Sequence, residues 1–341
     1  MRRSVLAFAS VLLMLCAPGA GLAAADPPPN IDSGSASLGT TPPGGAVPNQ
    51  ATVDHIVRIS PTRSAVFVNS PAMGRVVQVQ ILQPPSGGPR PTFYLLDGVD
   101  AGSEQSTWTK KTDAESFFAG KNVNVVLPVG GMGSFYTDWQ RPDTVLGVNK
   151  WESFLTKELP PLVDKQLGGN GVNAIGGLSM GGQSALILIT RHPDLYRGVA
   201  VYSACPDTAT SDSKALVRAT VGSRGGDATN MWGPDTDPAW TDHDPMTHAE
   251  KLRGKSVYVA VGNGLPGLHE LQLSEDLPSI VAEGGPIETV TLLCTRTFDA
   301  RLRGLGIPAR FDYRPTGTHS WPYWQDDLHT SWPTVAAALG L

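Results

Sequence analysis

One serine lies between two glycines at the point where a short apolar run gives way to a helical pattern. Residues 177–181 read Gly-Leu-Ser-Met-Gly, after an apolar run at 172–175 and before a helical pattern that starts near residue 184. A G-x-S-x-G string in this context predicts a sharp turn that lifts the hydroxyl of Ser179 above a sheet edge. Small flanking residues let strand and helix approach closely, and a helix N-terminus favours negative charge developing nearby. The junction therefore restricts the chain to architectures in which a strand leads directly into a helix.

Apolar runs alternate with helical patterns along most of the chain. Strands are expected at residues 53–57, 76–82, 92–96, 123–129, 172–175, 198–203, 256–261 and 309–313. Helices are expected at 152–167 with a kink or a split at its two prolines, at 184–190 and at 286–304. The stretch between the strands at 198–203 and 256–261 is expected to be irregular. Buried apolar strands that alternate with helices predict an α/β fold, with a mostly parallel central sheet and helices on both faces.

A serine nucleophile needs a base and an acid that orients the base, and with this motif they follow the serine in the order Asp or Glu, then His. His319 lies just after the last predicted strand, where a loop returns to the carboxyl edge of the sheet. The other histidines after Ser179 are His192, His243, His248, His269 and His329. His192 is expected to end the helix after Ser179, the next three to lie on the surface, and His329 in the final helix is the alternative base.

The acid and the oxyanion hole are less constrained by spacing. Four carboxylates remain open as the acid: Asp207, Glu283, Glu288 and Asp299. An oxyanion hole needs two backbone donors, of which one is the amide after the nucleophile, here Met180. The second donor is expected in the loop after an early strand, and Val99, which follows Asp97-Gly98, is the candidate.

The first 25 residues are organised as a secretory signal peptide. Arg2 and Arg3 precede an apolar run that is too short to span a bilayer, and Ala23–Ala25 offers a small-residue cleavage site. Residues 26–50, rich in Pro, Gly, Ser and Ala, are expected to be a disordered spacer, and residues 51–341 one domain. The mature protein is expected to be secreted, in the extracellular space or the cell envelope, with no transmembrane segment.

Export also changes how the cysteines and charges are interpreted. Cys205 and Cys294 remain after cleavage, and an oxidising compartment favours one disulfide over two free thiols. Two cysteines are too few for a structural zinc site, so no metal is expected. The chain has 26 Lys and Arg against 31 Asp and Glu, a net charge of -5, which argues against a nucleic-acid partner held by phosphate contacts.

Eight short strings, in order along the chain, resemble those of the secreted mycolyltransferases of the antigen 85 type and their corynebacterial relatives. They are Leu95–Gly98, Pro128–Gly131, Ser134–Trp139, Lys150–Leu155, Gly177–Met180, Met231–Pro234, Gly262–Gly264 and Gly317–Trp321. So many ordered strings are far more specific than any one of them. The resemblance covers roughly residues 53–340 and implies the α/β-hydrolase fold.

The same resemblance implies a function and assigns roles. Family members move a mycolyl chain from one trehalose monomycolate to another, or to cell-wall arabinogalactan, without a cofactor. In this chain Ser179 resembles the nucleophile and His319 the base, and the family acid falls on Glu288. Val99 and Met180 match the oxyanion amides. Asp97 and Trp321 match positions that line the trehalose site, so the expected substrate is a trehalose mycolate or a related acyl sugar.

Two departures from the family keep other functions open. Asp100 replaces the arginine beside the oxyanion loop, and Lys111 replaces an asparagine that also touches the sugar. They motivate a carboxylesterase as the alternative enzyme, in which water takes the acyl group from the serine. A secreted surface protein that binds a host or matrix protein is the non-enzymatic alternative, and a complete Ser–His–Glu set argues against it as the only role.

Overall fold

The computed structural model describes residues 50–85, 87–271 and 277–341. The predicted signal peptide at 1–25 and residues 26–49 of the predicted spacer lie outside the described residues. Nine strands in the described part form one sheet in the order β1-β2-β3-β5-β4-β6-β7-β8-β9. In chain order they are β1 Thr52–Arg58, β2 Arg63–Ser70, β3 Arg75–Leu82, β4 Arg90–Leu96, β5 Asn124–Pro128, β6 Gly169–Leu178, β7 Gly198–Tyr202, β8 Ser256–Val261 and β9 Arg310–Tyr313.

The sheet is mixed, and its parallel part runs from β5 to β9. β1, β2, β3 and β5 pair antiparallel, whereas β5, β4, β6, β7, β8 and β9 run parallel to one another. The predicted α/β class with a mostly parallel sheet is therefore confirmed. Parallel strands end at a common edge, so the loops after β4, β6, β7, β8 and β9 gather there.

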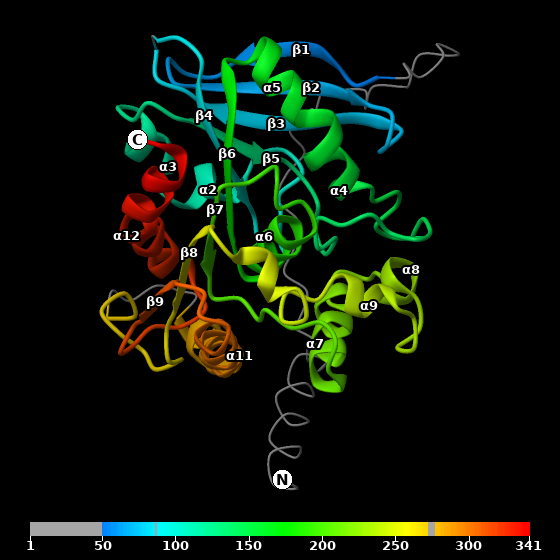
Figure 1. The fold of residues 1–341 in the computed structure, drawn as a ribbon, viewed down its shortest axis with the longest axis vertical. Coiled ribbons are helices and arrows are strands. Elements are labelled where there is room, and N and C mark those ends of the chain that lie inside the picture. The colour runs from blue at the N-terminus through cyan, green and yellow to red at the C-terminus, as the bar shows by residue number, and fades with distance from the viewer. Residues whose placement is uncertain (1–49, 86, 272–276) are drawn as a thin grey trace, which may run out of the picture.

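Helices cover both faces of the sheet (Figure 1). They are α2 Thr107–Lys111, α3 Ala114–Phe118, α4 Trp151–Ser153, α5 Leu159–Gln166, α6 Ser179–Arg191, α7 Ser211–Gly222, α8 Ala228–Trp232, α9 Ala239–Asp242, α10 Leu277–Ser279, α11 Gly285–Gly304 and α12 Trp321–Leu339, with π-helical turns η1 Phe154–Glu158 and η3 Ile280–Gly284 and the 3₁₀ turn η2 Ala249–Leu252. Apolar residues of α5, α6 and α11 share one core cluster, and those of α2, α3 and α12 share another.

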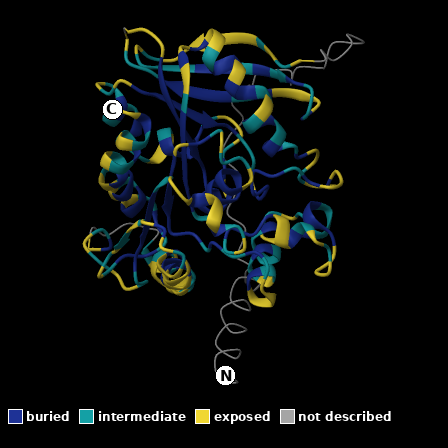
Figure 2. Cartoon of the chain, in the orientation of Figure 1, coloured by how far each residue is buried: buried dark blue, intermediate teal, exposed yellow. Residues whose placement is uncertain are grey.

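Side chains that alternate along a central strand pack into the two core clusters on opposite faces of the sheet. On β4, Tyr94 and Leu96 join the cluster under α6, whereas Phe93 and Leu95 join the cluster under α12. Every residue of β4, β5 and β7 is buried, so these central strands are covered on both sides (Figure 2). The edge strand β1 is mostly exposed. The carboxyl ends of the central strands are consequently rigid supports for the loops that follow them.

The structure departs from the sequence expectations between β7 and β8, and it also contains β2, α2 and α3, which were not expected. The stretch between β7 and β8 was expected to be irregular, and this is wrong over α7, whose Thr210 side chain caps the first turn by accepting from the Ser213 amide. The kink expected at Pro160 and Pro161 takes the form of a π-helical turn, after which both prolines occupy the first turn of α5. A first turn tolerates proline because its amides have no partner within the helix.

Candidate active site

Ser179 stands at the tip of the turn between β6 and α6. Its backbone has φ +50°, in the left-handed region that costs a non-glycine residue about 1 kcal/mol or more. The neighbouring glycines make the turn possible. A Cβ at Gly181 would lie 2.2 Å from the carbonyl oxygen of Asp97, and one at Gly177 would lie 2.6 Å from the backbone of Gly181. Strand, turn and helix can pack this closely only because both positions lack side chains.

His319 and Glu288 complete a continuous hydrogen-bonded chain with this serine. Nε2 of His319 lies 2.9 Å from Oγ of Ser179, and Nδ1 of His319 lies 2.8 Å from Oε2 of Glu288. His319 is in the loop between β9 and α12, and Glu288 is in the first turn of α11. The structure therefore brings together three residues that are separated by 109 and 31 positions along the chain.

Glu288 is fully buried and richly hydrogen-bonded. Its Oε1 accepts from Oγ of Ser203 at 2.8 Å, from the Gly262 amide at 2.6 Å and from Nη2 of Arg314 at 3.0 Å. Burial alone would raise the pKa of this carboxyl, but the hydrogen bond and charge of His319, the Arg314 guanidinium and the Gly262 amide outweigh it and lower the pKa. Glu288 is thus an anion at neutral pH, and an anion can orient an imidazole and stabilise its protonated form.

The other candidate bases lie elsewhere. His192 contacts Oε1 of Glu152 at 2.7 Å, and Nε2 of His243 lies 3.6 Å from Oε2 of the same carboxylate. His269 pairs with Asp326, and His329 pairs with Asp113. His248 lies at the start of η2. Each of these four paired rings is therefore engaged by a carboxylate away from Ser179.

The other candidate acids also have different partners. Asp207 caps the start of α7 through Thr210, and Asp299 binds Arg303 and Tyr313. Glu283 is exposed on η3. Of the four carboxylates that spacing left open, Glu288 is the one hydrogen-bonded to His319.

The amides of Met180 and Val99 are the predicted oxyanion donors. Met180 directly follows the serine, and Val99 follows Gly98, at which a Cβ would lie 3.8 Å from Cβ of Ser179. Met180 is the second residue of α6 and is 3% exposed, and its sulfur accepts from the amide of Phe135. The Val99 carbonyl accepts from the amide of Gly133 at 3.1 Å, which fixes the loop after β4. The amide of Met180 belongs to the free first turn of α6, where backbone N–H groups have no intrahelical partner.

Asp97 and Trp321, the predicted sugar-contacting residues, are packed into the protein. The Asp97 carboxylate is 1% exposed and accepts from the amides of Thr107 and Trp108, so it caps α2. Burial raises its pKa to about 7 against the lowering effect of these amides. Trp321 is half-buried and stands edge-on to Trp108 and Trp324, with ring centroids 5.4 and 5.3 Å apart. Any sugar contact from Asp97 would need this cap to rearrange.

The two positions that depart from the family pattern lie on the surface. Asp100 is 73% exposed and pairs with Arg224 at 2.6 Å, and Arg224 reaches it from the loop after α7. A guanidinium is therefore present beside the oxyanion loop, although it comes from another part of the chain. Lys111 is exposed at the end of α2.

The predicted Cys205–Cys294 disulfide is confirmed. Cys205 follows the loop residue Ser203, and Cys294 lies on α11, the helix that carries Glu288. The bridge closes a separation of 89 residues, a length at which the chain-entropy model gives a stabilisation of roughly 4–5 kcal/mol. It ties the loop after β7 to the helix that presents the acid.

A small apolar cavity opens directly beside Ser179. It encloses about 100 Å³ between α6, α7 and α11. Its apolar lining comes mainly from Phe135, Met180, Leu216, Val217, Ile287 and Val290. Besides Ser179, the polar residues in its wall are Gln183, Ser203, Asp207, Ser213, Thr220 and Thr291. The nucleophile therefore faces a space that suits hydrocarbon rather than water.

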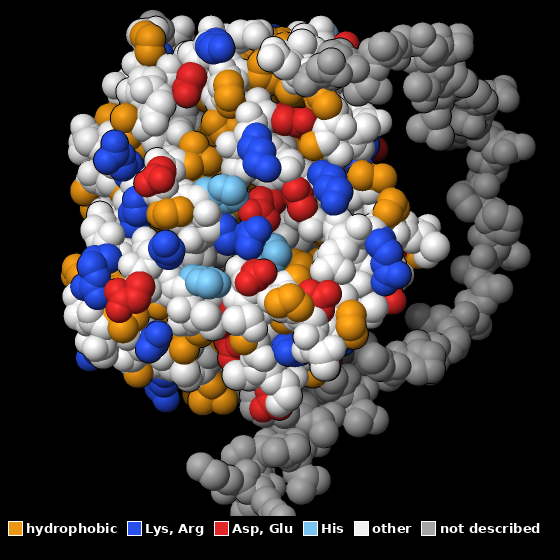
Figure 3. All heavy atoms as spheres, turned by 45° about the vertical axis from the view of Figure 1, so that its right-hand side comes forward, with side chains coloured by type: hydrophobic (Ala, Val, Ile, Leu, Met, Phe, Trp, Pro, Cys, Tyr) orange, Lys and Arg blue, Asp and Glu red, His pale blue; other side chains and the backbone are white. Residues whose placement is uncertain are grey.

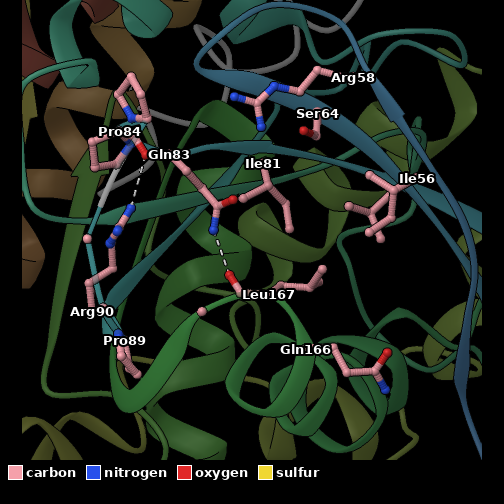
Figure 4. A pocket seen from close by; sticks show the side chains of 15 residues that line it. Ile56, Arg58, Ser64, Ile81, Gln83, Pro84, Pro89, Arg90, Gln166 and Leu167 are labelled. Atoms are coloured by element: carbon pink, nitrogen blue, oxygen red, sulfur yellow. Dashed lines mark hydrogen bonds between the residues drawn. The ribbon is translucent and has the colours of Figure 1, made fainter.

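A larger cavity lies at the opposite end of the sheet. It encloses about 470 Å³ near the amino-terminal ends of β4 and β6, next to Arg90 and Leu167 (Figure 4). Gln83 spans its wall by donating to the carbonyl of Leu167, and Arg90 donates to the carbonyl of Pro84. Because the triad lies at the carboxyl ends of the same strands, this cavity does not belong to the candidate site.

Three residues of the hydrogen-bonded network around Glu288 were not anticipated from the sequence. Ser203, Arg314 and Asp327 are distributed over the loop after β7, the loop after β9 and α12. Ser203 directly follows an apolar strand whose carboxyl end lies at the same sheet edge as Ser179, and this position is the one signal in the sequence that could have marked it. In the structure its backbone has φ +51°. Nothing local marks Arg314 or Asp327, because their importance comes from contacts across the fold.

Comparisons with known proteins show which family this chain resembles along most of its length. Residues 70–335 match a family described as "Putative esterase". Among curated proteins, the chain is 37% identical over 281 residues to a diacylglycerol acyltransferase/mycolyltransferase Ag85A of Mycobacterium leprae, covering 80% of this chain and 82% of that one. It is 36% identical over 310 residues to an Ag85B of Mycolicibacterium smegmatis, covering 87% and 91%.

Solved structures are similar to this chain over most of its length. MPT51 of Mycobacterium tuberculosis superposes with a TM-score of 0.67 at 29% identity, covering 79% of this chain and 96% of that one. An S-formylglutathione hydrolase from Agrobacterium tumefaciens superposes with a TM-score of 0.62 at 15% identity over 83% of this chain and 98% of that one, and this likeness concerns the fold alone.

Proposed function

The chain belongs to the family of the Ag85-type diacylglycerol acyltransferases/mycolyltransferases, and on that premise we propose that it is a serine acyltransferase that moves a mycolyl group between sugar esters. The observation that carries the proposal is the unbroken series of hydrogen bonds from Ser179 through His319 to Glu288. Ser179 is the nucleophile, His319 the base and Glu288 the orienting acid. No step in this chemistry requires a cofactor.

The reaction divides into two acyl transfers at Ser179. His319 takes the serine proton as Oγ attacks the ester carbon of the donor, and it then passes the proton to the departing sugar hydroxyl. The acceptor hydroxyl next gives its proton to His319 while it attacks the acyl-serine ester, and His319 returns that proton to Oγ of Ser179 as the acyl–serine bond breaks. The amides of Met180 and Val99 hold the negative oxygen in both tetrahedral intermediates, and such donors each lower the barrier by about 3–4 kcal/mol.

The apolar cavity supports an acyl substrate, because it can hold the first carbons of a hydrocarbon chain beside Ser179. Ser179 and apolar residues of α7 and α11 line the same cavity. A hydrocarbon chain attached to the ester carbon would therefore contact apolar side chains directly next to the nucleophile. The sugar end of the substrate is proposed to be trehalose or a related sugar, bound at the rim with a contribution from Trp321, whereas a contribution from Asp97 would require its cap on α2 to rearrange. Residues 51–341 are proposed to form this catalytic domain, preceded by the spacer at 26–50.

Secretion is part of the proposal. The arrangement of residues 1–25 supports export, and the disulfide between Cys205 and Cys294 is stable in an oxidising compartment. Among the described residues, every helix is too short or too polar to cross a bilayer. On the face seen in Figure 3, Lys and Arg side chains are interspersed with Asp and Glu.

The deciding assay is incubation of the mature protein with trehalose monomycolate. Transfer predicts trehalose dimycolate and free trehalose in equal amounts, because each turnover moves one acyl chain from one trehalose monomycolate, the donor, to a second one, the acceptor. Release of free mycolic acid without diester would assign the chain to the esterases. Failure of a fluorophosphonate to label Ser179 in the folded protein would favour the non-enzymatic surface protein.

A tryptophan in the cavity is expected to discriminate against long acyl chains. Val290→Trp places a large ring where the chain would lie, so kcat/KM for a long-chain p-nitrophenyl ester should fall by about tenfold or more, since several buried methylene contacts are lost at up to about 0.8 kcal/mol each. The butyrate ester should be affected several-fold less. Leu293→Trp, on the same helix but 49% exposed, is the matched control. Equal losses for both esters would place the acyl chain elsewhere.

A further inference from the structure

A line of buried charges runs from the triad into the last helix. Nη2 of Arg314 lies 3.0 Å from Oε1 of Glu288, and Nη1 of Arg314 contacts Oδ2 of Asp327 on α12. The side chains of Arg314, Glu288 and Asp327 are 14%, 0% and 4% exposed. The catalytic acid thus has a second charged neighbour besides the histidine, and that neighbour is itself paired.

Stability alone is a poor explanation for such a cluster. Taking three charges out of water carries a desolvation cost that their mutual attraction often fails to exceed, and apolar side chains of similar volume frequently serve as well. The guanidinium is placed on the oxygen of Glu288 that faces away from His319. From there it can act on the histidine only by holding the carboxylate and by adding its charge to the field at the imidazole.

We infer that Arg314 and Asp327 are positioning residues that hold the outer oxygen of Glu288 and balance the charge felt by His319 during catalysis. The inference rests on the proposed function of the triad. Arg314, with the Gly262 amide and Ser203, fixes the carboxylate plane so that Oε2 points at the imidazole. Asp327 cancels the charge of Arg314, which would otherwise oppose the imidazolium that forms in each transition state.

The charge of each member of this pair depends on the other. Desolvation alone would lower the pKa of Arg314, but Asp327 and Glu288 together raise it, so the guanidinium stays protonated. Burial raises the pKa of Asp327 to about 7 although the Arg314 guanidinium opposes that rise. Asp327 therefore balances Arg314 most fully above neutral pH.

The other titratable groups around the pair come from four elements. Tyr202 on β7, Tyr258 on β8 and Tyr323 on α12 all have pKa values raised by burial, so they remain neutral around pH 7. The ring of Tyr323 stacks under the Arg314 guanidinium at 5.3 Å. Asp312 on β9 accepts from Tyr258 and lies 3.8 Å from Arg310, which supplies its own countercharge.

The test is the pH profile of fluorophosphonate labelling at Ser179, which reports the triad without needing an acyl acceptor. Its acidic limb marks protonation of the histidine base. Asp327→Asn leaves an unbalanced cation that disfavours the imidazolium, so the limb should move to lower pH. Arg314→Gln removes the cation and should move the limb to higher pH. The shift for Arg314→Gln should be about one pH unit, as expected for one charge near the ring at an effective dielectric constant of about 20. The shift for Asp327→Asn should be smaller, because the raised pKa of Asp327 leaves it partly neutral on this limb.

Two further variants separate charge from structure. Arg314→Lys keeps the charge and should leave the limb within about 0.3 pH units of wild type, and the double variant R314Q/D327N, which restores neutrality, should do the same. Asp327→Asn keeps Arg314 paired with Glu288, so it carries the test even if Arg314→Gln does not fold. Slower labelling in all variants with an unmoved limb would overturn the inference, whereas absence of labelling in the wild-type protein would instead overturn the proposed function.

Discussion

Replacing Ser179 with alanine is expected to reduce formation of trehalose dimycolate by about 10⁴-fold or more, because removal of the nucleophile leaves only the binding site and the oxyanion donors. No neighbouring hydroxyl can take over, since Oγ of Ser179 is the atom that lies 2.9 Å from Nε2 of His319. The measurement is the initial rate of diester formation from trehalose monomycolate, with labelling by a fluorophosphonate as a second readout.

The same variant should fold normally. Alanine adopts the backbone angle of +50° at a cost similar to that for serine, so the free energy of unfolding should change by less than about 1 kcal/mol. Ser211→Ala, at an exposed position at the start of α7, is the matched control and should keep full activity. Diester formation within tenfold of wild type by folded Ser179→Ala would remove Ser179 from the mechanism and the proposed function with it.

The turn at Ser179 was predictable because its determinants are local. A short apolar run, a serine between small residues and a helical pattern are contiguous, and the closest contacts in the turn involve Gly177 and Gly181 themselves. The fold class followed from the same logic, repeated along the chain. The disulfide was predictable because export leaves two cysteines and an oxidising compartment pairs them.

Glu288 illustrates where local reasoning stops. Four carboxylates were kept as candidates, and the sequence contains nothing that says which of them α11 and its neighbours bury beside His319. The resemblance to the antigen 85 proteins selected Glu288, and the structure places that residue within 2.8 Å of the imidazole. Its role in catalysis remains a prediction that the next experiment addresses.

The helix α7 and the residues Arg314 and Asp327 were missed because the local sequence signal for each of them is weak or absent. α7 buries few apolar residues, mainly Val217 and Val221, so its hydrophobic period is faint against a background of Ser, Thr and Asp. Arg314 and Asp327 are 13 residues apart, and they meet only because β9 leads into α12 across the sheet edge. No spacing rule detects an ion pair that exists only after the sheet has formed.

Replacing Glu288 with glutamine is expected to reduce acyl transfer by about 10³- to 10⁴-fold at neutral pH. The structure specifies why an amide of nearly the same shape fails. The Gly262 amide and Arg314 can only donate hydrogen bonds, so they require the carbonyl oxygen of the glutamine on their side. The NH₂ group then points at Nδ1 of His319 and requires that nitrogen to accept. The proton of the neutral imidazole is left on Nε2, which can no longer take the proton of Ser179.

Glu283→Gln provides the matched control, because Glu283 was an alternative acid and is exposed on η3. It should keep the wild-type rate, and both variants should be compared by initial rates of diester formation and by urea unfolding. Since Arg314 keeps Asp327 as a partner in Glu288→Gln, the protein should stay folded, and the loss should appear in kcat rather than KM. A loss of less than tenfold in Glu288→Gln would mean that His319 is oriented by its packing against Trp324 and not by the carboxylate, and the triad would then reduce to a Ser–His pair.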